Sequence, residues 1–147
     1  MTANKFADMF APFSSQPNEE WQALLKAAGE AAASAYVPYS HRPMGAAAYA
    51  DDGRIVTGCS VENASIGLTL CAECGLVSAF VLSGGGGLTK IVVVDGAGQV
   101  IPPCGRCRQL LLEHGGPELM IWTPRGELSL AQLMPLSWGP EQLTGGR

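Results

Sequence analysis

Two cysteine pairs with the same internal spacing constrain this chain more than any other feature. The first pair reads Cys71-Ala72-Glu73-Cys74 and the second reads Cys104-Gly105-Arg106-Cys107, with 29 residues between them. We expect a helix to begin at each pair, so that residues three apart share one face and the free backbone amides favour thiolates. Both pairs can then face one metal ion, and thiolate-rich tetrahedral coordination is typical of zinc.

The spacing leaves two kinds of zinc site open. Four cysteines could close a structural site, but the separation exceeds the roughly 15–20 residues of common zinc ribbons, and such a site has no use for Glu73. A hydrolytic site keeps one position open for water beside a carboxylate. A Glu followed by Pro-Cys-x-x-Cys is the pattern of zinc nucleobase deaminases. On this pattern Cys71, Cys104 and Cys107 are the expected Zn²⁺ ligands, and Glu73 is the expected catalytic residue.

Length, charge and composition predict a single globular domain with a small ligand. A chain of 147 residues suits one core. A net charge of −4 argues against a protein that binds polynucleotides, which usually carries a basic face. The sequence shows neither a secretory start nor a membrane span, so we expect a cytoplasmic protein with reduced thiols. Residues 1–17 lack periodicity and are expected to form a flexible N-terminal arm, with the domain over residues 18–147.

Hydrophobic periodicity predicts an α/β sandwich in which helices cover one mixed sheet. The strand over residues 90–95 is fully apolar, which calls for helices on both of its faces. An Asp-Gly turn joins the first two strands. The expected elements are a helix from the Asn18 cap to the Pro38 region, strands 45–50 and 54–60, a helix from near Leu70 to the glycines at 84–87, strand 90–95, a helix from Pro103-Cys104 to Gly115-Gly116, strands 119–123 and 127–129, and a short helix near 130–134.

Further runs of residues, in the same order along the chain, resemble the homotetrameric zinc-dependent cytidine deaminases. They are Tyr39-Ser40-His41, Gly45-Ala46-Ala47, Asp52-Gly53, Gly58-Cys59, Val61-Glu62-Asn63-Ala64-Ser65, Cys71-Ala72-Glu73 and Pro103-Cys104-Gly105-Arg106-Cys107-Arg108-Gln109. The resemblance covers roughly residues 18–143 and looks most like the actinobacterial branch. It implies a three-layer sandwich with a mixed five-stranded sheet, and a homotetramer whose pockets are completed by neighbouring subunits.

The resemblance also implies the reaction. Cytidine or deoxycytidine would be hydrolysed to the uracil product with release of ammonia, as in pyrimidine salvage. Glu73 would accept a proton from the water that attacks C4 of the base and would return protons to N3 and to the leaving amine.

Cys74 differs from the commoner form of the family motif. Relatives with Cys-Ala-Glu-Arg place an arginine there that donates hydrogen bonds to the zinc thiolates, and three thiolates outweigh the charge of the metal by one. Arg106, Arg108 or the backbone amides at the two helix starts would have to offset that charge here. If Cys74 were instead a fourth ligand, the closed site would make the protein a non-catalytic, zinc-stabilised binding module.

The substrate-contacting positions also depart from the family pattern. Arg42 replaces an aromatic residue that stacks on the base, and Ser60 replaces an asparagine that holds the ribose together with Glu62. Trp138 replaces a phenylalanine contributed across a subunit interface, and Ala72 is the remaining implied contact. Because an arginine can stack on a base or pair with an anion, a modified, blasticidin-like aminopyrimidine nucleoside or another amino-heterocycle is an alternative substrate.

Two histidines, a fifth cysteine and a run of glycines are better explained by structural roles than by functional ones. His41 and His114 lack the spacing of metal ligands. We expect Cys59 to be a small buried hydrophobic residue. The run Gly84–Gly87 lacks the lysine and serine of a phosphate loop and is expected to be a flexible connection.

Overall fold

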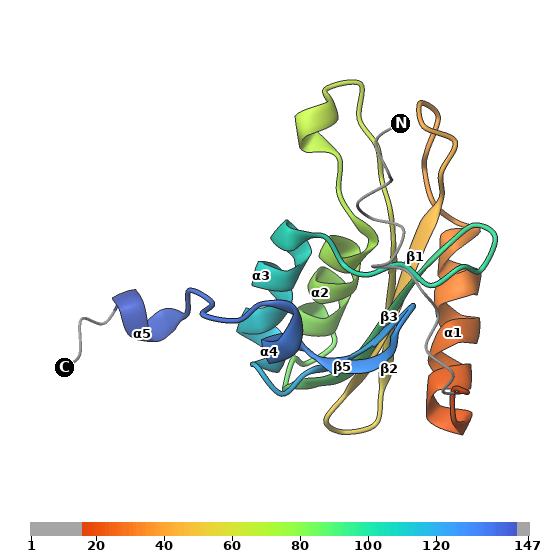
Figure 1. The fold of residues 1–147 in the computed structure, drawn as a ribbon. Coiled ribbons are helices and arrows are strands. Elements are labelled where there is room, and N and C mark those ends of the chain that lie inside the picture. Colours follow the sequence, from red (N-terminus) through yellow and green to blue (C-terminus); the bar gives the residue numbers. More distant parts are fainter. Residues whose placement is uncertain (1–15, 144–147) are drawn as a thin grey trace, which may run out of the picture.

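The computed structural model describes residues 16–143, which form three layers: a helix, a sheet, and a second set of helices (Figure 1). The elements are α1 (Glu19–Ala32), β1 (Met44–Ala50), β2 (Ile55–Cys59), the 3₁₀ helix η2 (Ile66–Leu68), α2 (Ala72–Leu82), β3 (Leu88–Asp95), α3 (Gly105–Gly115), β4 (Met120–Thr123), β5 (Gly126–Ser129), α4 (Leu130–Leu133) and α5 (Pro140–Leu143). None of the helices among these residues has the length and apolar character needed to span a bilayer.

The five strands form one mixed sheet in the order β2-β1-β3-β4-β5. β3 and β4 run parallel, and the other neighbouring pairs are antiparallel. The α/β class, the three layers and the mixed five-stranded sheet are therefore confirmed.

The central strand β3 is buried on both faces, as its apolar sequence predicts. Val92 and Val94 point toward α1 and join a core with Trp21 and Leu24. Ile91 and Val93 point the other way, into a core with residues of α2 and α3. Alternate residues of one strand thus hold the two helical layers in place.

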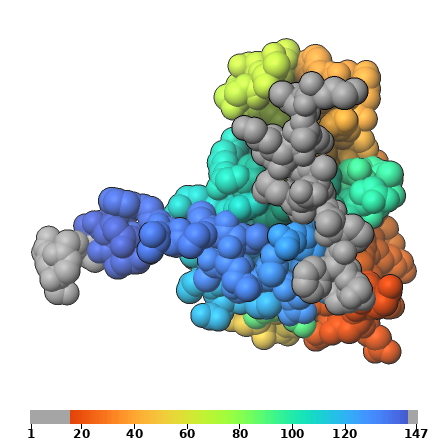
Figure 2. Space-filling view, in the orientation of Figure 1, coloured from red at the N-terminus to blue at the C-terminus, as the bar shows by residue number. Residues whose placement is uncertain are grey.

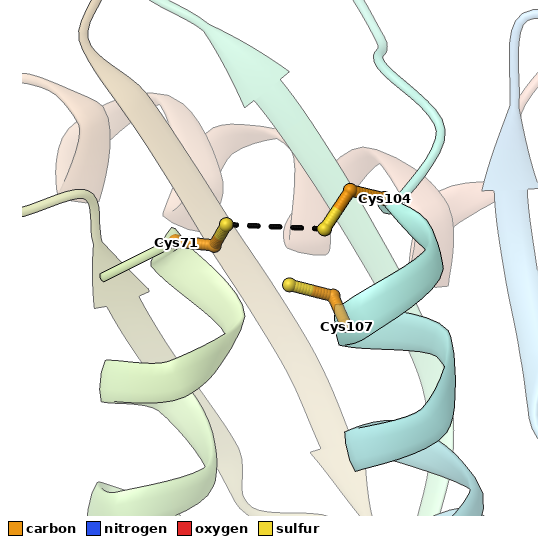
Figure 3. A group of neighbouring side chains, drawn as sticks. All are labelled: Cys71, Cys104 and Cys107. Carbon is orange, nitrogen blue, oxygen red and sulfur yellow. Dashed lines mark hydrogen bonds between the residues drawn. The ribbon is translucent and has the colours of Figure 1, made fainter. Parts of the chain in front are cut away.

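The second helical layer positions the cysteine pairs. α2 and α3 both pack on the same face of the sheet, α2 through Leu76 and Phe80 and α3 through Leu111. β2 allows α2 to come close, because Gly58 has no side chain: a Cβ there would lie 2.3 Å from the Ala72 carbonyl oxygen. The starts of α2 and α3 consequently meet at one end of the layer (Figure 3).

Some element boundaries differ from the sequence-based expectation. α1 ends at Ala32 rather than near Pro38, because the backbone of Tyr36 leaves the helix and pairs with that of Ser60 and Glu62. The sequence patterns did not predict η2 or α5. The expected flexible arm, residues 1–17, falls almost wholly outside the described residues.

Candidate functional site

Three of the four paired cysteines bring their sulfur atoms together at the starts of α2 and α3 (Figure 3). Cys71 is the N-cap residue of α2, and Cys104 is the N-cap residue of α3 with Cys107 one turn later. Their Sγ atoms all lie within 4.8 Å of one another, and those of Cys71 and Cys104 are 4.0 Å apart. We call these three residues the sulfur cluster.

The geometry of the sulfur cluster fits zinc. Two sulfurs of a tetrahedral site with Zn–S bonds of about 2.3 Å lie about 3.8 Å apart, close to the 4.0 Å between Cys71 and Cys104. Burial raises the pKa of Cys71 and of Cys107, and the charge of Glu73 raises both further. At Cys104, burial is outweighed by hydrogen bonds from Cys107, which lower its pKa. Two of the three thiolates therefore form unfavourably unless a cation binds, which suits a metal-binding role.

Glu73 lies in the first turn of α2, between the two members of the first cysteine pair. Only 4% of its surface is exposed, and it lines the same pocket as Cys71 and Cys104. Burial raises the pKa of this carboxyl, with hydrogen bonding and the charge of Arg106 opposing the shift in part. A desolvated carboxyl in a pocket wall beside three thiols can accept and release a proton there.

Cys74 is not part of the group of converging ligand atoms among residues 16–143. Its sulfur instead accepts a hydrogen bond from Arg106 Nη2 at 3.2 Å, and the same nitrogen lies 3.4 Å from the Thr69 carbonyl oxygen. Arg108 is engaged elsewhere, since it donates to the carbonyl oxygens of Pro103 and Leu133. Of the two arginines in the second motif, Arg106 is the one directed at the cysteines.

Four of the five expected substrate contacts line the pocket beside the sulfur cluster, which has a volume of about 310 Å³. They are Arg42, Ser60, Glu62 and Ala72. Ser60 is buried, and its hydroxyl accepts a hydrogen bond from the Met44 backbone.

Glu62 is held in place by local hydrogen bonds. Its Oε2 accepts from the backbone N–H groups of Tyr39 and Ser40 at 3.0 and 3.2 Å. Hydrogen bonding from Ser40, through side chain and backbone, and from Tyr39 keeps the pKa of this carboxyl below its ordinary value. Glu62 therefore lines the pocket as a carboxylate.

Trp138 is the expected contact that the fold does not bring to this pocket. It lies beyond α4, on the segment that leads to α5, and that segment stands off from the body of the domain (Figures 1 and 2). The Trp138 carbonyl oxygen accepts a hydrogen bond from Gln109, while 59% of the residue is exposed.

The pocket also has apolar walls that sequence reasoning did not single out. They include Val93, Ile101 and Pro102, and they lie with Met44, which the resemblance marks as a changed position near Arg42. Apolar residues on strands and connections carry no signal that separates a pocket wall from the core. Cys59, expected to be buried, is only partly so, and His114 makes an edge contact with the ring of Phe80.

Comparisons with known proteins agree with this site. The family model described as the cytidine and deoxycytidylate deaminase zinc-binding region matches residues 18–123. The cytidine deaminase of Mycobacterium tuberculosis is 55% identical over 127 residues, which cover 86% of this chain and 96% of that protein.

Solved structures give the same result. The crystal structure of cytidine deaminase from Mycobacterium tuberculosis superposes with a TM-score of 0.81 at 56% identity, covering 83% of this chain and 99% of that chain. The corresponding enzyme from Mycobacterium leprae gives a TM-score of 0.79 at 55% identity, covering 80% of this chain and 99% of the other. Sequence, fold and the three clustered sulfurs thus lead to one assignment: the chain belongs to the cytidine and deoxycytidylate deaminase family of zinc-dependent hydrolases.

Proposed function

We propose that this protein hydrolyses the 4-amino group of cytidine and deoxycytidine, with release of ammonia and the uracil nucleoside. The observation that carries the proposal is the buried carboxyl of Glu73 in the wall of the pocket that also contains Cys71 and Cys104. The pocket volume of about 310 Å³ lies at the lower end of the range for small-molecule sites and suits a nucleoside.

In this proposal Cys71, Cys104 and Cys107 hold the zinc ion. When bound, zinc supplies Lewis-acid activation of a water molecule. Cys74 stays outside the coordination sphere, paired with Arg106 as described above. Three protein ligands would leave the open position that a hydrolase needs and that a closed structural site lacks.

Glu73 performs the proton transfers. As a carboxylate it accepts one proton from the attacking water and passes it to N3 of the base. It then accepts the proton of the new hydroxyl on C4 and passes it to the departing amine. The C4–O bond forms, the C4–N bond breaks, and ammonia leaves with its extra hydrogen from the water. Burial suits Glu73 to both roles, because a raised pKa brings the acid and base forms closer in free energy near neutral pH.

The remaining contacts orient the nucleoside. The Glu62 carboxylate lines the pocket and can accept a hydrogen bond from a sugar hydroxyl. Ala72 lines the pocket at the start of α2, and Ser60 and Arg42 line it as well. We include in the proposal a homotetramer in which Trp138 completes a neighbour's pocket, because Trp138 is exposed and is not among the described residues that line the pocket of its own chain.

The cellular role proposed with this activity is pyrimidine salvage in the cytoplasm. All five cysteines are free thiols, as a zinc site in a reducing compartment requires. We also propose residues 18–147 as one folded unit, with residues 1–17 as an arm outside it.

Replacing Glu73 tests the catalytic proposal. The Glu73→Gln and Glu73→Ala variants should lose about 10³-fold in kcat for cytidine, because the proton carrier is gone. Bound zinc, measured by elemental analysis, should be unchanged. Glu113→Gln, an exposed change on α3, is the matched control and should retain full activity.

Two results would refute the proposal. One is full ammonia release by Glu73→Gln. The other is a cobalt-substituted protein whose absorption spectrum reports four sulfur ligands and no exchangeable water, because that coordination describes a zinc-stabilised binding module.

A further inference from the structure

A cavity that the proposed function does not use lies between α3, the turn from β4 to β5, and α4. Its volume is about 410 Å³, within the range of small-molecule sites. Among the described residues, Pro102 lines both this cavity and the catalytic pocket. We call it the arginine cavity, because Arg108 and Arg125 line it.

The protein does not balance the positive charge of the arginine cavity. None of the described lining residues is acidic, although the whole chain carries a net charge of −4. Glu127, which follows the turn that carries Arg125, is engaged on the α1 side of the sheet, where its Oε2 accepts a hydrogen bond from Trp21 Nε1 at 2.9 Å. Neither Arg108 nor Arg125 forms an ion pair within residues 16–143. The cavity therefore attracts anions.

Hydrogen-bond donors on three lining side chains are left over for a ligand. Arg108 donates through Nε and Nη1 to the carbonyl oxygens of Pro103 and Leu133 at 2.9 and 2.8 Å. Its Nη2 and the whole guanidinium of Arg125 have no hydrogen-bond partner within residues 16–143. Gln132 uses its Oε1 in the capping box of α4, which leaves its amide N–H groups without a bond in the described chain.

The backbone that carries Arg125 is fixed although its guanidinium is free. Thr123 is buried, and its hydroxyl donates to the Gly126 carbonyl oxygen at 2.8 Å and accepts from the Arg125 N–H at 3.1 Å. Gly126 closes the turn with φ of 90°, a conformation that favours glycine. The bonds of Arg108 hold the facing wall. A cavity with walls fixed in this way loses little conformational entropy when a ligand binds.

We propose that the arginine cavity binds a small organic anion. The carboxylate or phosphate of this ligand pairs with Arg125 and with the free nitrogen of Arg108, because a guanidinium matches the oxygens of either group. The apolar part of the ligand lies against Leu128 and Leu133, which together with Pro102 supply apolar surface to the cavity. The ligand undergoes no reaction there, and the proposal does not depend on deaminase activity.

A pair of ligands that differ in charge tests the proposal. Benzoate and benzamide have nearly the same shape, and titration calorimetry on the zinc-loaded full-length protein measures the affinity for each. Benzoate should bind about tenfold more tightly, the effect of one charge-assisted hydrogen bond, and high salt should reduce the difference. Phenyl phosphate in the same titration distinguishes a phosphate ligand from a carboxylate ligand. Inorganic phosphate binding as tightly as phenyl phosphate would contradict the role of the apolar surface.

Variants locate the effect. Arg125→Gln should lower the affinity for benzoate about tenfold and leave that for benzamide unchanged, and Arg125→Lys should retain part of the difference. Gln132→Glu adds a carboxylate to the cavity but keeps the capping box of α4, because a glutamate also serves at that position, so it should weaken benzoate binding without loss of the fold. Arg42→Gln is the matched control: Arg42 lines other cavities, so the affinity for benzoate should not change.

Three results would overturn the proposal. One is equal affinity for benzoate and benzamide in the unmodified protein. Another is benzoate binding that survives both Arg125→Gln and Gln132→Glu, or that is lost in Arg42→Gln, since the anion then binds elsewhere. The third is a rise in the KM of cytidine in proportion to benzoate concentration with kcat unchanged, because that places benzoate in the catalytic pocket. The titrations need no turnover, so a failure of the proposed deamination leaves them decisive.

Discussion

Arg106 lies where one cation can act on several cysteines and on Glu73. Its guanidinium donates to Cys74, and its charge also interacts with Cys71 and Cys107. The charge of Arg106 also acts on Glu73, where it opposes the rise in the pKa of the carboxyl. Three thiolates around Zn²⁺ leave a net negative charge, so a nearby guanidinium should stabilise the loaded site.

Removing this cation should weaken zinc binding. We expect Arg106→Ala to lower the affinity for zinc by about tenfold, as outer groups of metal sites typically do, measured by competition with a chromogenic chelator. Arg108→Ala is the contrast: its hydrogen bonds go to Pro103 and Leu133, so it should lower the melting temperature with little change in zinc affinity. Equal zinc affinity in Arg106→Ala and the unmodified protein would contradict this account.

The sequence predicts part of the site at the scale of single residues. The convergence of the two cysteine pairs follows from their spacing at two helix starts. The choice of three sulfurs with Glu73 beside them follows from the pattern of a Glu followed by Pro-Cys-x-x-Cys. The choice between Arg106 and Arg108 could not be made, because it depends on how α2 and α3 face each other. The cavity of about 520 Å³ lined by Arg42 and Asp95 was equally beyond prediction, because the pairing of Met44 with Asp95 that brings the two segments together is long-range and no local pattern encodes it.

Gly58 of β2 allows α2, the element that carries Glu73, to pack closely on the sheet, and Gly75 of α2 faces it. A Cβ on Gly58 would lie 2.3 Å from the Ala72 carbonyl oxygen and 2.3 Å from the Leu76 nitrogen. A Cβ on Gly75 of α2 would make only ordinary contacts of 3.7 Å or more. The two positions face each other, yet only one of them lacks room for a methyl group.

Alanine at these glycines should have opposite effects on stability. Gly58→Ala forces helix and sheet apart and should lower the free energy of unfolding by about 1–3 kcal/mol. Gly75→Ala lies in a helix interior and should raise it by about 0.5–1 kcal/mol, because alanine loses less backbone entropy on folding. Urea unfolding of both variants measures this. A stable Gly58→Ala protein would show that the layers can separate without cost.

Several helices and strands could be predicted from the sequence alone, and others could not. The burial of β3 on both faces, the Asp-Gly hairpin and the short helix after β5 follow from local patterns, and all three form. The predicted end of α1 was wrong. The apolar spacing in the sequence continues past Ala32, but the helix ends there because the backbone of Tyr36 pairs with a distant segment. Strand order likewise depends on long-range pairing.

At the scale of the whole molecule, the described chain has apolar surface that its own fold leaves uncovered. Leu136, Trp138 and Leu143 are exposed on the C-terminal segment, and Ile66 and Leu68 are exposed on η2. Exposed apolar residues gathered on projecting segments are typical of subunit interfaces. The proposed homotetramer would cover them and would carry Trp138 to a neighbour's pocket.

A mixed assembly tests whether pockets are shared. Glu73→Ala chains lack the proton carrier, and Trp138→Ala chains lack the proposed contribution to a neighbour, so each homotetramer should be nearly inactive. When the two are co-expressed in equal amounts, about a quarter of the pockets should combine an intact Glu73 with a neighbour's intact Trp138. Co-expressed protein should therefore recover about a quarter of the unmodified activity, whereas the separately purified variants, mixed without subunit exchange, should recover none. Sedimentation of a monomer, or activity no greater than the sum of the separate variants, would contradict shared pockets and leave Trp138 a surface residue of its own chain.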